Sequence, residues 1–266
     1  GMLIRAITPY VAGHWVFVDV ETDEGIRGSG EATWFSHPLA CAAVVRDLAV
    51  DLIGHDPMRA EYHFARLMKR HAVRDGTEVS ALSAIDQALW DIKGKALGVP
   101  VWQLLGGRVR DRVRAILLVE APTADEVVST AAAAAAEGFT ALKIKPFVGD
   151  WALRSTARLL GDAAELVGRV RDAIGWDVDL AVEVHRNLVP ADAKVFSTMV
   201  AENLLYFLED PILPFSTAAN IALAPHLRSP LAIAERSNNI WEFREVSDCH
   251  DVAFLRPDVG VAGGFT

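Results

Sequence analysis

Six short apolar runs, separated by stretches of helical pattern, fill the chain beyond residue 111 and limit what it can fold into. The runs cover residues 115–120, 140–146, 178–184, 204–210, 230–235 and 251–258. Nearly continuous apolar strands that alternate with helices are typical of a parallel sheet covered by helices, because such strands are buried on both faces. Two α/β folds remain open: a doubly wound sheet, or part of a (β/α)8 barrel.

Polar residues at the ends of these runs favour the barrel. Barrel enzymes build their active sites at the C-terminal ends of several strands. A doubly wound sheet instead binds its ligand at one switch point, after a Gly-rich turn that this sequence lacks. We therefore predict an incomplete TIM-like barrel of about six strands over residues 111–266. The polar residues at or near these strand ends are Lys145, Glu183, Glu209, Glu235 and Asp258.

Residues 2–110 carry a different pattern. Apolar and polar positions alternate around a turn over residues 2–32, as in antiparallel strands. Residues 39–97 have apolar positions at helical spacing. A small antiparallel sheet followed by helices predicts an α+β domain over residues 2–110, ahead of the barrel domain.

Charge and cysteine content narrow the environment and the partners. The net charge of −9, with no run of Lys or Arg to offset it, argues against a nucleic-acid or anionic-membrane partner. No apolar run approaches the ~20 residues that a helix needs to span a bilayer. Cys41 and Cys249 lie far apart and in no metal-binding spacing, which favours a reducing cytoplasm.

Three glutamates follow one another at equal steps of 26 residues: Glu183, Glu209 and Glu235. A step of one β/α unit places them at matching heights on three neighbouring strands. Three converging carboxylates would repel one another unless a hard cation lay between them, and Mg²⁺ prefers such oxygen ligands. The other interpretation is three unrelated acids that cap helices or form surface ion pairs.

Lys143 and Lys145 share one face of the run 140–146, because side chains alternate along a strand. Taken alone, they are typical of a half-exposed edge strand with solvated lysines. Opposite a metal site, we predict Lys145 as a general base and Lys143 as a second cation that contacts substrate oxygen. Mg²⁺ would stabilise the enediolate charge that forms when a carboxylate substrate loses its α-proton.

The chain resembles the mandelate racemase/muconate-lactonizing branch of the enolase superfamily. The resemblance begins with "SALSAIDQALWDIKGKALGVPVWQLLGG" and continues through "KIK", "EVH", "LEDP", "AIAER" and "RPDVGVAGGFT". It implies an α+β capping domain, a modified TIM barrel, one Mg²⁺ and removal of a proton α to a carboxylate. By position it implies Glu183, Glu209 and Glu235 as metal ligands, Lys145 as the base, and Asp258 as the acid that orients a catalytic histidine.

His185 and the segment "ERSNNIWEF" are most similar to the acid-sugar dehydratases of that branch, of the galactonate and gluconate type. There a histidine protonates the departing 3-hydroxyl group, and alternation puts His185 on the same strand face as Glu183. The resemblance implies an aldonate or aldarate substrate and a homo-oligomer. The residue alone is also compatible with a histidine bonded to nearby backbone.

Two features depart from the family's pattern. Its first metal ligand is usually aspartate, whereas Glu183 is one methylene longer, which would shift the metal or weaken its binding. The chain also stops at Thr266, where the family continues for about two more strand–helix units. We therefore expect a C-terminally truncated chain, in which Asp258 lacks its histidine, or a partner chain that covers the gap.

The sequence leaves three functions open. The first is a Mg²⁺-dependent acid-sugar dehydratase, a hydro-lyase. The second is a racemase, epimerase or cycloisomerase of the same superfamily, in which Lys145 would serve equally well. The third is a catalytically inactive remnant that still binds metal. His185 separates the first two, because only dehydration needs an acid for the leaving hydroxyl group.

Overall fold

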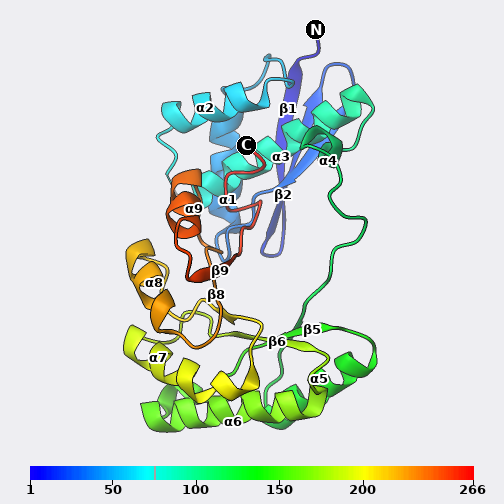
Figure 1. Cartoon of the computed structure of the whole chain (residues 1–266). Coiled ribbons are helices and arrows are strands. Elements are labelled where there is room, and N and C mark those ends of the chain that lie inside the picture. Colours follow the sequence, from blue (N-terminus) through cyan, green and yellow to red (C-terminus); the bar gives the residue numbers. More distant parts are fainter. Residues whose placement is uncertain (75) are drawn as a thin grey trace. The chain divides into compact units, whose positions relative to one another are not determined.

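Figure 1 shows the computed structural model of the chain, in which residues 1–74 and 76–266 are described. The chain divides into two compact units. The first contains Gly1–Asp111, Glu235–Glu242 and Pro257–Thr266, and the second contains Arg112–Ala234 and Phe243–Arg256. Each unit has a hydrophobic core of its own. The division into domains at residues 110 and 111 stays a prediction.

The first unit holds a three-stranded antiparallel sheet in the order β1-β2-β3. The strands are β1 (Ile4–Ala12), β2 (Trp15–Thr22) and β3 (Arg27–Glu31). Alternation sets the buried face, since Val16, Val18 and Val20 are buried while Trp15 and Phe17 are exposed. The antiparallel strands expected over residues 2–32 are therefore present.

Helix α3 covers the buried face of this sheet. The helices of the first unit are α1 (Pro38–Ala49), α2 (Ala60–Arg70), α3 (Gly76–Leu97) and α4 (Val101–Leu104). Leu82, Ile85 and Leu89 recur at helical spacing and are fully buried. Helix and strand pack so closely that a Cβ atom at Gly30 would lie 2.0 Å from the carbonyl oxygen of Ala84, which is why a glycine is needed there.

The segment Pro257–Thr266 packs against α3 through two side chains. Ser83 Oγ accepts the N–H of Gly263 at 2.9 Å. Asp86 Oδ2 accepts the N–H groups of Phe265 and Thr266 at 2.7 and 3.0 Å. Burial raises the pKa of the Asp86 carboxyl group, although these hydrogen bonds act in the opposite direction.

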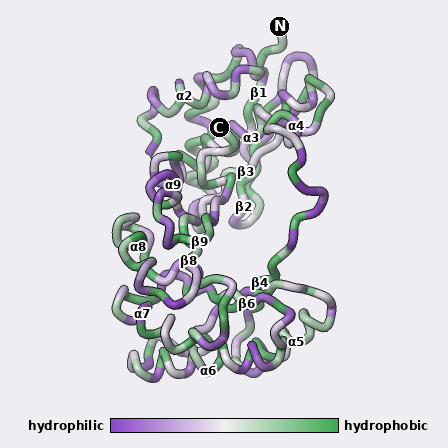
Figure 2. Tube along the Cα trace, in the orientation of Figure 1, coloured by the Kyte–Doolittle hydropathy of each residue, from purple (hydrophilic) through white to green (hydrophobic). Residues whose placement is uncertain are grey.

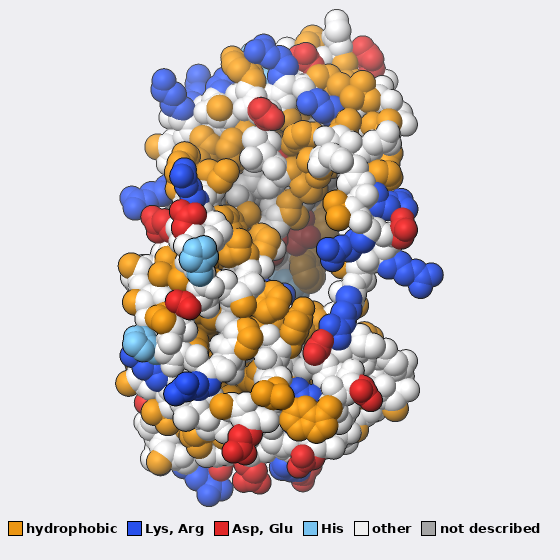
Figure 3. Space-filling view, in the orientation of Figure 1, with side chains coloured by type: hydrophobic (Ala, Val, Ile, Leu, Met, Phe, Trp, Pro, Cys, Tyr) orange, Lys and Arg blue, Asp and Glu red, His pale blue; other side chains and the backbone are white. Residues whose placement is uncertain are grey.

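Basic side chains gather over α2 (Figure 3). Two of them pair with Asp51, which follows α1: Arg70 Nε lies 2.8 Å and Arg66 Nη2 3.6 Å from its carboxylate oxygens. His71 Nε2 lies 2.7 Å from Asp51 Oδ2. The hydrogen bond from His71, followed by the charge of Arg70, lowers the pKa of Asp51. These contacts of Arg66, Arg70 and His71 with Asp51 link α2 to the residues that follow α1.

The second unit is built on a parallel sheet in the order β4-β5-β6-β7-β8-β9. Each strand lies within one of the six predicted runs, and the spatial order follows the chain order, as in a barrel. A barrel-like α/β fold after an α+β unit is thus confirmed. The strands are β4 (Leu117–Val119), β5 (Ala141–Ile144), β6 (Asp179–Glu183), β7 (Leu208–Glu209), β8 (Leu231–Ile233) and β9 (Val252–Leu255).

Helices follow these strands, and α5, α6 and α7 lie on one side of them (Figure 1). Hydrophobic and hydrophilic residues alternate along α6 (Figure 2), and its apolar face enters the core with Val167 and Val170. The helices are α5 (Ala124–Ala136), α6 (Thr156–Ile174), α7 (Pro190–Met199), α8 (Thr217–Leu223) and α9 (Ile240–Ser247), with short 3₁₀ turns at η1 (Trp151–Leu153), η2 (Ala201–Asn203) and η3 (Ala224–His226).

A run of alanines, residues 131–136, forms the second half of helix α5. A capping box fixes its start, because Thr123 Oγ1 accepts the N–H of Glu126 while the Glu126 carboxylate accepts the N–H of Thr123. Ala131 and Ala134 are buried against the sheet. Within the described parts of the chain, no helix combines the length and the apolar character that crossing a membrane requires.

Candidate active site

Strand register brings two of the predicted acids face to face in the second unit. Glu183, the last residue of β6, pairs with Glu209, the last residue of β7. Both strands are parallel, so their side chains emerge at the same edge of the sheet. On the other side of β6, Lys143 of β5 pairs with Ala181. This edge is the C-terminal end of the strands, where barrel enzymes place their chemistry.

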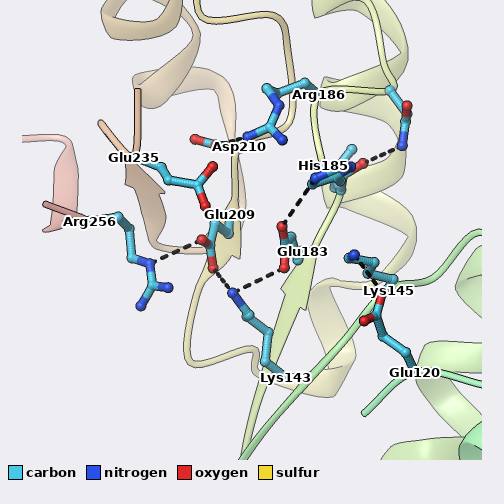
Figure 4. Close-up of polar contacts among 12 residues, drawn as sticks. Glu120, Lys143, Lys145, Glu183, His185, Arg186, Glu209, Asp210, Glu235 and Arg256 are labelled. Atoms are coloured by element: carbon cyan, nitrogen blue, oxygen red, sulfur yellow. Dashed lines mark hydrogen bonds and ion pairs between the residues drawn. The ribbon is translucent and has the colours of Figure 1, made fainter. Parts of the chain in front are cut away.

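The two glutamates converge on one ammonium group. Lys143 Nζ lies 3.0 Å from Glu183 Oε2 and 2.8 Å from Glu209 Oε2 (Figure 4). The exposed fractions are 6% for Lys143, 6% for Glu183 and 1% for Glu209, so these charges are largely removed from water. Arg256, one residue beyond β9, adds a second cation: its Nε lies 3.0 Å from Glu209 Oε1. Two carboxylates and two cations therefore balance one another, as buried charges require.

The donor set suits a hard cation. Two buried carboxylates already meet at one positive group, and their oxygens are the ligands that Mg²⁺ prefers. The spacing of the acids predicts a metal ion between them, whereas in the structure the Lys143 ammonium lies between Glu183 and Glu209. Within residues 1–74 and 76–266, no group of three or more His, Cys, Asp or Glu side chains is arranged to hold a metal ion.

Glu235, the third predicted ligand, follows β8 by two residues and belongs to the first unit. There its carboxylate Oε2 lies 3.8 Å from Arg236 Nε. The guanidinium of Arg236 in turn stacks on the ring of Phe35, with its Cζ 3.3 Å from the ring centroid. The ligand set of three glutamates stays a prediction.

Lys145 has a partner that the sequence analysis did not single out. Its Nζ lies 2.5 Å from Oε1 of Glu120, the residue after β4, and the side chains are 31% and 52% exposed. Val119 pairs with Ile144 in the register of β4 and β5, so the next residues, Glu120 and Lys145, emerge together. Glu120 is the last residue of the apolar run 115–120. An acid at this strand end could have indicated that Glu120 belongs to the site.

The chain makes a tight turn directly after β6, at His185. His185 and Arg186 have φ angles of 56° and 68°, and Asp210, directly after β7, has 41°. Residues other than glycine rarely adopt this left-handed conformation, and such strain is typical of functional sites. Arg186 holds the turn by donating its N–H to the Asp210 carbonyl at 2.7 Å and Nη1–H to Asp210 Oδ2 at 2.9 Å.

The imidazole of His185 stays close to the acid pair. Its Nε2 lies 3.9 Å from Glu183 Oε1, and its side chain is 44% exposed, so a substrate could reach it. Figure 4 shows His185 and Glu183 pointing toward one another, with Lys145 on the side of Glu120. The second unit therefore gathers Lys143, Lys145, Glu183 and His185 at one end of its sheet.

Asp258 lies in the first unit and caps a turn of its own segment. Its Oδ1 accepts the N–H of Gly260 at 2.8 Å, and its carbonyl oxygen accepts the N–H groups of Val261 and Ala262. The side chain is exposed. Its role in orienting a histidine stays a prediction.

Comparisons with known proteins give family matches for both parts of the chain. Residues 4–106 match the N-terminal domain of the mandelate racemase/muconate lactonizing enzyme family, and residues 126–266 match the enolase C-terminal domain-like family. A D-galactonate dehydratase from Ralstonia pickettii (strain 12J) is 34% identical over 267 residues, which cover 100% of this chain and 70% of the relative.

Solved structures share the fold. A member of the enolase superfamily from Salmonella Typhimurium superposes with a TM-score of 0.94 at 29% identity, covering 100% of this chain and 75% of that chain. An enolase from Agrobacterium radiobacter, with bound Na and L-malate, has a TM-score of 0.90 at 29% identity, covering 99% of this chain and 69% of that chain.

Proposed function

The chain belongs to the mandelate racemase/muconate lactonizing enzyme family, and from this premise we propose that it is a Mg²⁺-dependent hydro-lyase that removes water from an aldonate or aldarate. It is an acid-sugar-dehydratase-like member of the enolase superfamily, as its similarity to D-galactonate dehydratases indicates. The observation that supports the proposal most is the buried contact of Glu183 and Glu209 with one cation, beside Lys145 and His185.

Glu183 and Glu209, together with Glu235, would hold Mg²⁺. When bound, the ion would supply positive charge that stabilises the enediolate form of the substrate. Lys143 now neutralises two of these acids. With the acids engaged elsewhere, its ammonium would be available to a substrate carboxylate.

Lys145 and His185 would move the protons. Lys145 Nζ would take the proton from the carbon next to the carboxylate, and the electron pair of that C–H bond would stay on the substrate. His185 would donate a proton to the 3-hydroxyl group, whose C–O bond then breaks to release water. The half-exposed His185 side chain suits this role, because the departing water needs a path out.

One experiment tests both removal of the α-proton and loss of the 3-hydroxyl group. The chain is incubated with Mg²⁺ and a panel of aldonates and aldarates in D₂O, starting with D-galactonate, and NMR monitors loss of the α-proton and formation of the 2-keto-3-deoxy acid. His185→Asn should abolish dehydration and retain α-proton exchange. Lys145→Ala should abolish both.

The same experiment separates the alternatives. Exchange or epimerisation with no dehydration on any substrate would indicate a racemase, an epimerase or a cycloisomerase. Binding of Mg²⁺ with neither exchange nor turnover across the panel would indicate a metal-binding protein without catalysis. Calorimetry with Mg²⁺ supplies the binding measurement for that case.

We also propose that the chain acts in the cytoplasm as a homo-oligomer. The two cysteines, Cys41 and Cys249, are both free thiols, and burial raises the pKa of Cys41, which keeps it protonated and unreactive. Sedimentation equilibrium measures the oligomeric state, and fractionation of cells that express the chain measures its location.

A further inference from the structure

Lys143 in β5 and Lys145, which directly follows this strand, contact separate sets of acids. Lys143 is buried and contacts Glu183 and Glu209, whereas Lys145 is half-buried and contacts Glu120. All of these contacts lie within the second unit, on the neighbouring strands β4, β5, β6 and β7 or one residue beyond them. Of the two lysines, only Lys143 contacts Glu183 and Glu209, and Lys145 contacts a different acid.

Strand register fixes the second pair. Because Val119 lies opposite Ile144, Glu120 leaves β4 at the level where Lys145 leaves β5. The Lys145 Nζ to Glu120 Oε1 distance of 2.5 Å is that of a direct ion pair. Glu120 thus reaches Lys145 without any change in the backbone.

A base that takes a proton from carbon gains a positive charge. When the C–H bond breaks, its proton forms the third N–H bond of the Lys145 ammonium group, and the electron pair remains on the substrate. A carboxylate already placed against that nitrogen stabilises the charge as it develops, at no cost in reorganisation. Both side chains are partly exposed, so the ammonium can return its proton to water before the next substrate binds.

We infer that Glu120 is the counter-ion of Lys145: it holds the amine at the strand end and stabilises the ammonium that proton abstraction produces. Glu120 touches Lys145 rather than the substrate, and it is therefore a positioning residue. This inference rests on the proposed function, in which Lys145 is the base.

Three substitutions separate charge from hydrogen bonding. Glu120→Gln keeps a hydrogen-bond acceptor but removes the charge, and it should lower kcat on the order of 10-fold with KM within about twofold. Glu120→Ala should lower kcat by a similar factor. Glu120→Asp keeps the charge on a shorter side chain and should recover part of the rate.

The matched control is Asp125→Asn on α5. Asp125 is an exposed acid that also pairs with a basic residue, Arg169, and its loss changes the net charge equally. It should leave kcat and KM unchanged. A wild-type value of kcat in Glu120→Gln, or a change in KM alone, would overturn the inference while leaving the dehydratase proposal intact.

A measurement without turnover tests the ion pair itself. NMR of isotopically labelled lysine ammonium groups should show Lys145 as an ordered group in slow exchange with water, identified by its disappearance in Lys145→Arg. Glu120→Gln should make that signal less ordered and Asp125→Asn should not. If Lys145 is equally ordered without Glu120, the pairing is wrong. If the pairing holds but no substrate exchanges its α-proton, the proposed function fails, and with it the catalytic part of the inference, while the ion pair of Glu120 with Lys145 stands.

Discussion

Glu183 lies directly opposite Glu209 in the register of β6 and β7, and both carboxylates contact the same ammonium group. Two neighbouring carboxylates that are buried away from water are tolerated only with a cation between them. Lys143 supplies that cation, and Arg256 supplies a second from the side of β9. The C-terminal edge of the sheet therefore holds two carboxylates that Lys143 and Arg256 neutralise.

Removal of Lys143 should destabilise the fold unless a metal ion replaces it. In Lys143→Met with a chelator present, we expect the free energy of unfolding to fall by about 3 kcal/mol, because a buried charge loses its partner. Excess Mg²⁺ should recover part of that loss. Urea denaturation followed by circular dichroism, with and without Mg²⁺, measures both values.

Lys95→Met is the control for this substitution. Lys95 forms an exposed ion pair with Asp91 on α3, which is worth at most about 1 kcal/mol. The decrease in the free energy of unfolding of Lys95→Met should be small and independent of Mg²⁺. An equal loss of stability in Lys143→Met with and without Mg²⁺ would show that the acids do not receive the ion.

Glu209 should matter for metal affinity more than any exposed acid. Glu209→Gln removes one charge from the proposed ligand set, and we expect Mg²⁺ to bind at least about tenfold more weakly, since ligand charge sets the affinity of such sites. Titration calorimetry measures the change, with Glu202→Gln as the control, because Glu202 is exposed in the turn η2. Unchanged affinity in Glu209→Gln would remove Glu209 from the ligand set.

Periodicity was enough to predict the strands but not the pairs between them. The run 204–210 contains only the two-residue strand β7, because Leu204 takes a left-handed conformation at the end of η2 and the residue pairs with β6 start at Leu208. The 26-residue step from Glu183 to Glu209 was enough to predict that these two residues lie at the same level on neighbouring strands. Sequence spacing cannot carry the ion pair of Glu120 with Lys145, because it depends on the register of two strands joined by a helix.

Asp51 should make stability depend on pH in the acidic range. The hydrogen bond from His71 and the charge of Arg70 lower the pKa of Asp51 in the fold. Its contribution is therefore complete above the ordinary aspartate value of about 3.9 and is lost as the pH falls through the lower folded value. The free energy of unfolding of Asp51→Asn should lie roughly 1 kcal/mol below wild type at neutral pH.

The difference between these two proteins should shrink below about pH 4, where Asp51 of the unfolded wild-type chain begins to take up a proton while the folded carboxylate stays charged. Denaturation at a series of pH values measures it. Asp47→Asn, an exposed position on α1, controls for the loss of one negative charge. A difference that stays constant down to the most acidic conditions would contradict this account of Asp51.

Gly264 should tolerate no side chain, because Asp86 occupies the space. A Cβ atom at Gly264 would lie 2.3 Å from Asp86 Oδ2, which holds the following N–H groups. Gly98 has a similar φ, +69° against +80°, but nothing within 4 Å of an added Cβ. Gly264→Ala should therefore cost about 2 kcal/mol more in unfolding free energy than Gly98→Ala. Equal losses in the two variants would mean that backbone strain alone is measured and that the segment does not pack on α3.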